Sequence, residues 1–332
     1  MTVLVTGGAG YIGSHTVRAL RDQGHDVVVL DSLEYGHPEA VLGAPLVVGD
    51  IADRALVQRV IDENAVDAVV HFAAYKAAGE SMEIPERYFE NNVVRSAEFF
   101  AALVAGGVRR VVFSSTCAVY GTPRTLPVDE THPTGPESPY GESKRIVEQM
   151  LRWFDECHDV RSVSLRYFNA AGASPDGRIG EDNPRPLNLV PLAMQAALGQ
   201  LPVLTIHGTD YPTPDGTTIR DYIHVDDLAT AHVLALEYLG SGGETTLVNV
   251  GTGRGASTRE VVEGTKRVSG VNFATQDGPR RPGDPTEVYA DNRRARELLG
   301  WEPRHDLDGI LESAWAWHSS HPKGYASTST NS

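Results

Sequence analysis

Tyr140 and Lys144 have the residue types and the spacing for proton-transfer chemistry. They lie in the run Ser138-Pro139-Tyr140-Gly141-Glu142-Ser143-Lys144, which opens a predicted helix. On a helix, a separation of four residues places both side chains on one face, one turn apart. A fixed ammonium beside a phenol favours the phenolate, so we expect the pKa of Tyr140 to fall below its ordinary value of ~10. Such a tyrosine is a usable general base for a hydroxyl proton.

The Tyr-x-x-x-Lys pattern also arises by chance on amphipathic helices, and the N-terminus of the chain supplies independent support. An apolar strand over Thr2 to Thr6 runs into a turn with glycines at Gly7, Gly10 and Gly13, and a helix follows. Glycines allow the tight turn and let backbone N–H groups approach a pyrophosphate at the helix N-terminus. The spacing is G-x-x-G-x-x-G rather than the commoner G-x-G-x-x-G, but the physical basis is similar.

A second apolar strand, Val27 to Leu30, ends at Asp31 and is followed by Ser32. A carboxylate at this position can accept hydrogen bonds from both hydroxyls of an adenosine ribose. A 2′-phosphate would meet the negative charge of Asp31 with no arginine beside it, so NAD is favoured over NADP. The alternative is a glycine turn in a nucleotide-free domain, with Asp31 serving as a helix cap.

The composition excludes several classes of partner. The 332 residues carry a net charge of −15, which argues against nucleic acid or an anionic membrane as a main partner. No apolar stretch approaches the ~20 residues that a membrane span needs, and the N-terminus enters a strand with no signal peptide. The two cysteines, Cys117 and Cys157, suggest reduced thiols and a cytoplasmic location. The twelve histidines form no recognisable ligand cluster, so we expect no metal.

The first half of the chain alternates valine-rich strands with helices, which indicates a parallel sheet covered on both faces. We therefore predict an α/β fold with a Rossmann-type doubly wound parallel sheet and a smaller mixed α/β substrate-binding region. Helices are expected near 11–22, 53–63, 86–105 and 140–156. The predicted organisation is an NAD-binding domain over 1–170 with some later segments packing back on it, a substrate region over 171–318, and a disordered polar tail over 319–332.

An ordered set of motifs along residues 1–317 resembles the extended short-chain dehydrogenase/reductase family, and within it the UDP-glucose (UDP-galactose) 4-epimerases. The motifs are Gly7–Thr16, Gly49-Asp50-Ile51, His71–Lys76 with Gly79-Glu80-Ser81, Asn91-Asn92-Val93, Phe113–Thr116, Ser138–Lys144, Leu165–Gly172, Asp210–Thr213, Arg220–Val225 and Arg281–Asp284. One such motif is a weak signal, whereas the ordered set is specific for the epimerase group.

The resemblance implies a reaction in which held NAD⁺ takes a hydride from C4 of a UDP-hexose while Tyr140 removes the proton of the 4-hydroxyl. The 4-keto sugar would turn over and take the hydride back on its other face. Lys144 would tune Tyr140 and bind the nicotinamide ribose, and Thr116 would hydrogen-bond the 4-hydroxyl. The resemblance also implies a homodimer, formed through the helices near 86–105 and 140–156.

The remaining site residues are also implied by the resemblance, position by position. The cofactor residues are Gly7, Gly10, Tyr11, Ile12, Gly13, Asp31, Ser32, Asp50, Ile51, Phe72, Ala73, Lys76, Asn91, Ser114, Tyr140, Lys144, Tyr167 and Phe168. The UDP-sugar residues are Lys76, Thr116, Tyr140, Asn169, Asn188, Leu189, Thr205, His207, Arg220, Arg281, Asp284 and Val288.

Two positions depart from the family pattern. His207 stands where an aromatic ring often stacks on uracil, and an imidazole can stack too. Val288 stands where the family varies between tyrosine and smaller residues beside the sugar. A small residue leaves room for a 2-N-acetyl group, so we hypothesise activity on UDP-N-acetylglucosamine as well as on UDP-glucose.

Three alternative functions compete with this interpretation. A 4,6-dehydratase needs an acid and a base directly after the Ser/Thr, but Thr116 is followed by Cys117 and Ala118. A UDP-glucuronate 4-epimerase would need donors for the C6 carboxylate, which the sequence does not exclude. A catalytically dead relative that binds a sugar nucleotide would commonly have lost Tyr140 or Lys144, and both are present.

Overall fold

The computed structural model describes residues 1–183, 186–281 and 283–327. Its centre is a seven-stranded parallel sheet in the order β10-β6-β5-β4-β1-β2-β3. The strands are β1 (Thr2–Thr6), β2 (Asp26–Asp31), β3 (Leu46–Val48), β4 (Ala68–His71), β5 (Arg110–Thr116), β6 (Arg161–Tyr167) and β10 (Thr246–Val250). This is the doubly wound order, with the direction of winding reversed between β1 and β4. The predicted Rossmann-type fold is confirmed.

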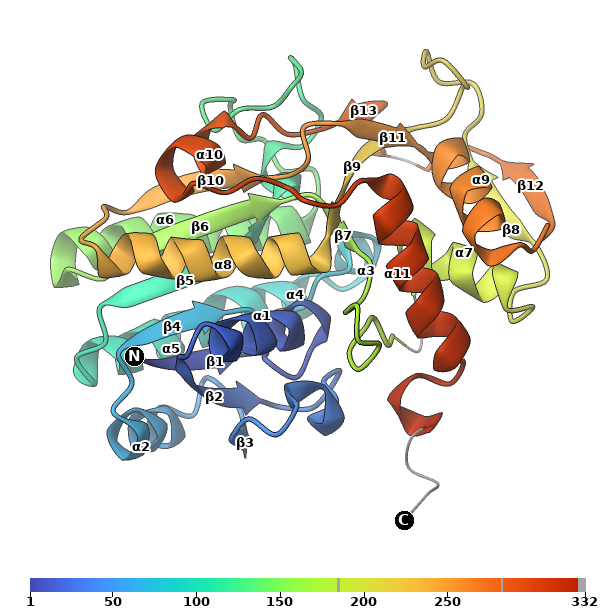
Figure 1. The fold of residues 1–332 in the computed structure, drawn as a ribbon. Helices are drawn as coiled ribbons and strands as arrows, with labels where there is room; N and C mark the ends of the chain where they lie inside the picture. Colours follow the sequence, from blue (N-terminus) through green and yellow to red (C-terminus); the bar gives the residue numbers. More distant parts are fainter. Residues whose placement is uncertain (184–185, 282, 328–332) are drawn as a thin grey trace.

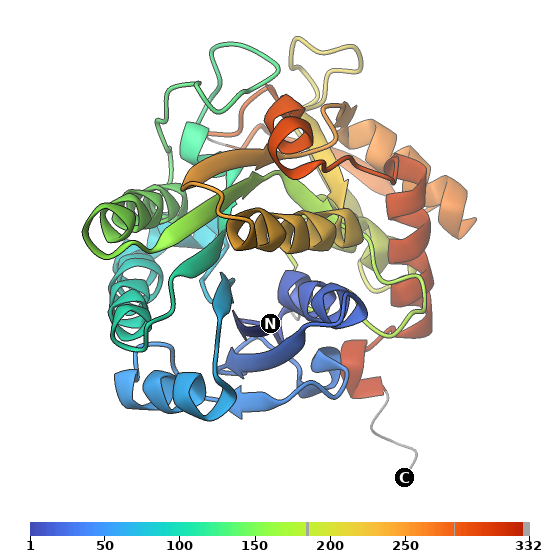
Figure 2. The ribbon, with the colours of Figure 1, turned by 60° about the vertical axis from the view of Figure 1, so that its left-hand side comes forward.

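Helices cover both faces of this sheet (Figures 1 and 2). One face carries α1 (Tyr11–Asp22), α8 (Val225–Gly240) and α10 (Arg293–Leu299), and the other carries α2 (Arg54–Asn64), α5 (Arg95–Ala105) and α6 (Pro139–His158). Because the central strands are buried on both faces, they read as continuous valine runs. Within the described residues, no helix is long and apolar enough to cross a membrane.

The helix expected near 86–105 is divided into three parts. It consists of α4 (Pro85–Phe89), a π-helical turn η2 (Glu90–Val94) and α5. Asn92 in the π turn is buried, and its side-chain amide donates to the Tyr75 carbonyl at 3.0 Å and the Ser143 hydroxyl at 3.0 Å. Such turns concentrate near functional sites, and this one joins the segment after β4 to the helix that carries Tyr140 and Lys144.

The second region is built around β9 (Ile219–His224), which pairs with β7 (Asn169–Ala171), β11 (Gly255–Ser257) and β13 (Glu287–Val288). A separate pair is formed by β8 (Leu204–His207) and β12 (Thr275–Gly278). Three helices pack around them: α7 (Leu189–Ala197), α9 (Thr258–Ser269) and α11 (Leu307–Ser320). α9 starts with a capping box between Ser257 and Glu260. From this half of the chain, α8 and β10 return to the first sheet.

The expectation of a disordered tail over 319–332 is wrong for residues 319–327. α11 continues to Ser320, and a 3₁₀ turn, η4, spans Gly324–Ser327. Tyr325 is buried against Trp317 with ring centroids 5.0 Å apart, and its backbone N–H donates to the Asp182 carboxylate at 2.8 Å. This aromatic contact anchors the segment despite its polar composition. Residues 328–332 lie outside the described residues.

Candidate active site

Several of the predicted site residues lie at the carboxyl ends of the parallel strands, along one edge of the sheet. Residues at or just after these ends include Gly7 after β1, Asp31 in β2, Phe72 after β4, Thr116 in β5 and Tyr167 in β6. In open α/β sheets, ligands bind outside this edge, at the point where the winding direction reverses. The candidate site therefore lies beyond β1, β4 and β5.

The start of α6 holds Tyr140 in place. Ser138 caps the helix by accepting a hydrogen bond from the Gly141 N–H at 3.2 Å, and Pro139 occupies the first helical position. The Tyr140 N–H, which has no partner within the helix, donates to the Ser81 hydroxyl at 3.1 Å. The first turn of α6 is thus tied to a second segment of the chain.

Tyr140, Lys144 and Thr116 are brought together between α6 and β5. Tyr140 is 8% exposed, and its hydroxyl lies next to that of Thr116. Lys144 is 3% exposed, and its ammonium donates to the Ser114 carbonyl at 2.8 Å and lies 4.8 Å from the centre of the Phe113 ring. α6 and the carboxyl end of β5 therefore bring these three side chains close to one another.

The expected direction of the Tyr140 pKa is wrong for this structure. Burial raises the pKa of Tyr140 well above its ordinary value, and the neighbouring Tyr167 adds to this increase, while the Thr116 hydroxyl opposes it. Burial also lowers the pKa of Lys144 to about 7. The helical spacing predicted proximity correctly, but burial of both groups disfavours the charged form of each. The phenol is therefore neutral near pH 7.

Aromatic residues continue this site along β6. The Tyr167 hydroxyl shares a hydrogen bond of 2.8 Å with the Ser114 hydroxyl. Phe168 is buried in a small cluster with Val288 and Ala290, against which Cys117 packs. Burial raises the pKa of the Cys117 thiol to about 12, so this thiol is a poor nucleophile or base near neutral pH.

The glycine turn forms a close-packed cradle at the start of α1. A Cβ added at Gly13 would lie 2.2 Å from the Gly7 carbonyl oxygen, and one at Gly7 would lie 2.7 Å from the Ala73 nitrogen. Gly10 caps α1 without a side-chain hydrogen bond, which leaves the first-turn amides available to an anion. Tyr11 and Ile12 begin the helix, and the Tyr11 hydroxyl donates to the Gly172 carbonyl at 2.7 Å. These residues fit the pyrophosphate of a dinucleotide.

Asp31 lies beside this cradle. One carboxylate oxygen accepts from the Ala9 N–H at 2.9 Å and the other from the Leu33 N–H at 2.8 Å. Each oxygen retains acceptor capacity for a ribose hydroxyl. Ser32 follows, and its hydroxyl accepts from the Glu34 N–H at 3.4 Å.

The other predicted cofactor residues surround the same edge. Asp50 pairs with Arg95, and the neighbouring Ile51 is buried. Phe72 packs against His232 with ring centroids 4.6 Å apart. The Lys76 ammonium lies 3.6 Å from the Glu181 carboxylate and 5.9 Å from the centre of the Tyr11 ring. The Asn91 side chain donates to that of Asn92 at 3.1 Å.

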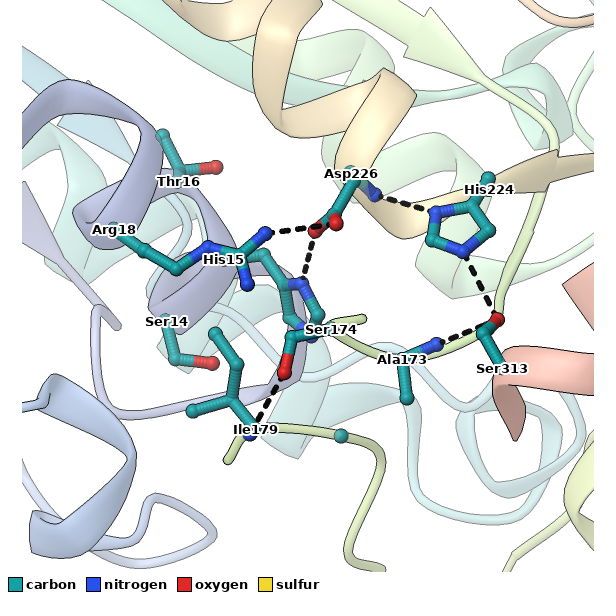
Figure 3. A network of polar contacts seen from close by, with 12 residues as sticks. Ser14, His15, Thr16, Arg18, Ala173, Ser174, Ile179, His224, Asp226 and Ser313 are labelled. Atoms are coloured by element: carbon teal, nitrogen blue, oxygen red, sulfur yellow. Dashed lines mark hydrogen bonds and ion pairs between the residues drawn. The ribbon is translucent and has the colours of Figure 1, made fainter. Parts of the chain in front are cut away.

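A polar network, largely buried, attaches α1 to the second region (Figure 3). From α1, Arg18 and His15 contact the Asp226 carboxylate at 2.7 and 2.6 Å. His224 accepts from the Asp226 N–H at 3.0 Å, so its other ring nitrogen carries the hydrogen and donates to Ser313 at 2.9 Å. Burial lowers the pKa of His224 to about 3, which keeps it neutral. The network fixes β9, which also carries Arg220, relative to the dinucleotide cradle.

Two of the predicted substrate residues are paired with each other. The Arg220 guanidinium forms an ion pair with Asp284 and donates to the carbonyls of Ile219 and Pro285, each at 2.7 Å. Asp284 and Arg281 line an open pocket of about 430 Å³, together with Thr122, Tyr211, Arg280, Gly283, Pro285 and Thr286. The sequence assigned no role to Arg280 and Tyr211, which stack at 4.1 Å.

The other predicted substrate residues are spread over the second region. Asn169 starts β7, Asn188 caps α7 and Leu189 begins α7. The Leu189 side chain packs into the apolar clusters around α7, so only its backbone is free for a ligand. The Thr205 hydroxyl accepts from Gln276 at 3.0 Å, and His207 lies 3.4 Å from the Pro279 carbonyl oxygen. Val288 is buried beside Phe168.

Sequence reasoning missed the residues that support the catalytic pair. Ser81 and Asn92 lay within the quoted motifs but were given no role, and both form hydrogen bonds with residues of α6. Glu148 was also missed, although it continues the four-residue spacing of Tyr140 and Lys144. For metals, the part of the chain that the structure describes holds no group of three or more His, Cys, Asp or Glu side chains suited to an ion.

A Rossmann-type sheet with a glycine cradle, and a Tyr-Lys-Thr set at the same edge, defines a dinucleotide-dependent enzyme that acts on a hydroxyl group. The chain belongs to the NAD-dependent epimerase/dehydratase family, whose model matches residues 3–251.

Among its relatives, a UDP-glucose 4-epimerase of Azospirillum brasilense is 52% identical over 320 residues, covering 96% of this chain and 92% of the relative. A UDP-glucose 4-epimerase from Brucella ovis in complex with NAD aligns with a TM-score of 0.93 and 47% identity over 95% of this chain and 97% of that one. A UDP-glucose 4-epimerase from Stenotrophomonas maltophila, with bound NAD and formylated UDP-arabinopyranose, aligns with a TM-score of 0.95 and 43% identity over 97% and 99%.

Proposed function

We propose that the chain catalyses the NAD-dependent 4-epimerisation of UDP-glucose and UDP-galactose through a transient 4-keto sugar. The observation that carries this proposal is the contact of Tyr140 with Thr116 at the sheet edge that also holds the glycine cradle. The near full-length similarity to UDP-glucose 4-epimerases supports the choice of substrate.

The residues divide the chemistry between them. NAD, which the glycine cradle and Asp31 would hold, supplies reversible hydride exchange at C4 of the sugar. Tyr140 must first lose its own proton; as the phenolate, which the Lys144 ammonium favours, it takes the proton of the 4-hydroxyl as the ketone forms and returns it when the alcohol is restored. Thr116, which lies next to Tyr140, would orient that hydroxyl. The Lys144 ammonium stabilises negative charge that develops on the phenol.

The second region would bind the UDP part of the substrate. Arg220 and Arg281 are suited to the diphosphate because a guanidinium fork binds phosphate oxygens in pairs. Asp284 and the pocket that it lines would take the uridine ribose. We infer that residues 1–170 bind the cofactor, together with α8 and β10, which come later in the chain. Residues 171–318 would bind the UDP-sugar.

The test is proton NMR of UDP-galactose incubated with the purified protein and no added cofactor. We expect conversion to a constant mixture of UDP-glucose and UDP-galactose, which would demonstrate both 4-epimerisation and a retained NAD. If there is no conversion even with added NAD⁺, the hexose assignment is wrong. Conversion of UDP-glucuronate alone would replace it with the uronic acid reaction.

The small side chain at Val288 leads to a prediction about specificity. Val288 is 6% exposed in the cluster with Phe168, and we infer that a larger side chain at this position would project toward the sugar. We expect the wild-type protein to epimerise UDP-N-acetylglucosamine. Val288→Tyr should reduce kcat/KM for the acetylated sugar by ~100-fold or more while changing that for UDP-galactose less than ~5-fold. Coupled assays on both substrates check this, and wild-type turnover of the acetylated sugar below a thousandth of the hexose rate contradicts it.

We further propose that the protein is a cytoplasmic homodimer that associates through α5 and α6. Two large apolar residues near this face, Val94 and Trp153, are each 54% exposed. The unpaired thiols of Cys117 and Cys157 suit a reducing compartment. Light scattering should give twice the chain mass of 35.9 kDa, and Trp153→Glu should shift the protein toward the monomer. A monomer at micromolar concentration rules the dimer out.

A further inference from the structure

Three successive residues of β5 contact three side chains that lie one turn apart on α6. The Ser114 carbonyl accepts from Lys144, and Thr116 lies next to Tyr140. Between them, the Ser115 hydroxyl donates to the Glu148 carboxylate. Tyr140, Lys144 and Glu148 are four residues apart, so they share one helix face. The Ser115–Glu148 bond therefore secures the helix to the strand between the two catalytic contacts.

Glu148 is buried, and both oxygens of its carboxylate accept hydrogen bonds. Its carboxylate accepts two hydrogen bonds from the Arg166 guanidinium, at 2.9 Å from Nε and 2.6 Å from Nη2. Arg166, 3% exposed on β6, also donates to the Tyr120 hydroxyl at 3.0 Å, and that hydroxyl donates to Asn249 on β10 at 2.7 Å. A buried ion pair is costly unless its geometry satisfies both partners, as it does here. The network joins α6 to β5, β6 and β10.

We propose that Glu148 is a positioning residue for the reaction, which holds α6 against β5 through Ser115 and Arg166 and places a negative charge one helical turn from Lys144. The proposal rests on the proposed function, since it concerns the same Tyr140 and Lys144. It explains why a charged pair is retained beneath the site when apolar side chains could fill the same space. Ser115 and Arg166 occupy paired positions of β5 and β6, so the carboxylate holds both strands at once.

The charges around Lys144 give the direction of the expected effect. The titratable groups whose charges couple with it are His71 from β4 and Glu148 from α6. Burial lowers the pKa of His71 to about 3, so His71 is neutral near pH 7. The site tyrosines Tyr140 and Tyr167 are neutral as well, because burial raises the pKa of each. Burial lowers the pKa of Lys144 to about 7, and Glu148 opposes that change.

The Lys144 ammonium is present below its pKa and is lost as the pH rises through it. Removing the negative charge of Glu148 will therefore lower the pKa of Lys144 and move the alkaline limb of the kcat profile to lower pH. We expect Glu148→Gln to shift this limb by about one pH unit, which corresponds to a ~10-fold loss of kcat above the shifted pKa. KM for UDP-galactose should stay within ~2-fold, because the UDP-binding residues lie elsewhere. Glu142→Gln, which removes a half-buried ion pair with Arg145 on the same helix, is the matched control and should leave the profile unchanged.

A second readout does not depend on turnover. The chain has only four lysines, Lys76, Lys144, Lys266 and Lys323, so isotope-labelled lysine side chains can be titrated individually by NMR, with Lys144→Met for assignment. In Glu148→Gln, the Lys144 signal should titrate at lower pH than in the wild type, while those of the other three lysines stay in place. If the protein turns over no UDP-hexose, the proposed function is wrong, but the titration of Lys144 still tests the role of Glu148.

Glu148→Gln leaves Arg166 partly unpaired and can impair folding. The double variant Glu148→Leu with Arg166→Met replaces the pair by apolar side chains of similar size, which buried ion pairs often tolerate. We expect this variant to fold, as judged by circular dichroism, and to show a downward shift of the Lys144 titration that is smaller than in Glu148→Gln, because the positive charge of Arg166 is removed as well. If both folded variants retain the wild-type Lys144 titration and pH profile, Glu148 is only a structural residue and the proposal is wrong.

Discussion

Replacing Tyr140 by phenylalanine will lower kcat for the epimerisation of UDP-galactose by about 10³-fold, within the range that general base catalysis contributes. The substitution removes one hydroxyl group and keeps the ring that fills the space between α6 and β5. Because the hydroxyl contacts Thr116 and not the cradle, we expect the NAD content and the KM for UDP-galactose to change little. Measurements of kcat, KM and bound NAD on the same preparation check all three.

The matched control is Tyr238→Phe on α8. The Tyr238 hydroxyl accepts one hydrogen bond from the Glu244 N–H at 3.1 Å, so the change costs a comparable contact away from the site. It should leave kcat unchanged. A Tyr140→Phe enzyme that retains more than ~10% of the wild-type kcat would show that another group moves the proton, since loss of the base should cost at least 10²-fold.

The sheet and the cradle could be predicted because the signals are local. Valine runs such as Val27–Leu30 specify strands buried on both faces, and glycines at three-residue spacing specify the turn between β1 and α1. The Tyr140 and Lys144 spacing likewise predicted a shared helix face. The pKa of Tyr140 was not predicted, because it depends on burial by β4, β5 and β6, which are distant in sequence.

The contacts between residues of the second region could not be predicted from the sequence either. The sequence placed Arg220 and Asp284 in separate roles, but β9 and the segment before β13 bring them into one ion pair. The polar composition of the tail predicted disorder, and a single tyrosine gives no periodic signal that would have indicated otherwise. Tyr325 nevertheless packs against Trp317, which is eight residues earlier and on α11. Such contacts depend on the arrangement of elements rather than on local composition.

Replacing Gly13 by alanine will remove most of the bound NAD. An added Cβ would lie 2.2 Å from the Gly7 carbonyl oxygen and 2.8 Å from Gly8 Cα. Both are backbone atoms of the phosphate-binding turn, so the turn itself must move. We expect at least a ~100-fold weaker affinity for NAD, since a phosphate held by several backbone N–H groups depends on their alignment. The measurement is the NAD released from the heat-denatured purified protein, together with a thermal melt with and without added NAD⁺.

A graded series separates this effect from general destabilisation. A Cβ at Gly10 would approach the Gly7 oxygen only to 3.3 Å, whereas one at Gly240 on α8 would meet nothing closer than Met1 at 3.8 Å. NAD retention should therefore fall in the order Gly240→Ala, Gly10→Ala, Gly13→Ala, and the melting temperatures of the purified proteins should fall in the same order, because bound NAD stabilises the folded state. Full NAD occupancy in a folded Gly13→Ala protein would mean that the turn after β1 does not hold the pyrophosphate. The assignment of the cofactor to this edge of the sheet would then fail, even if the protein still epimerised UDP-galactose.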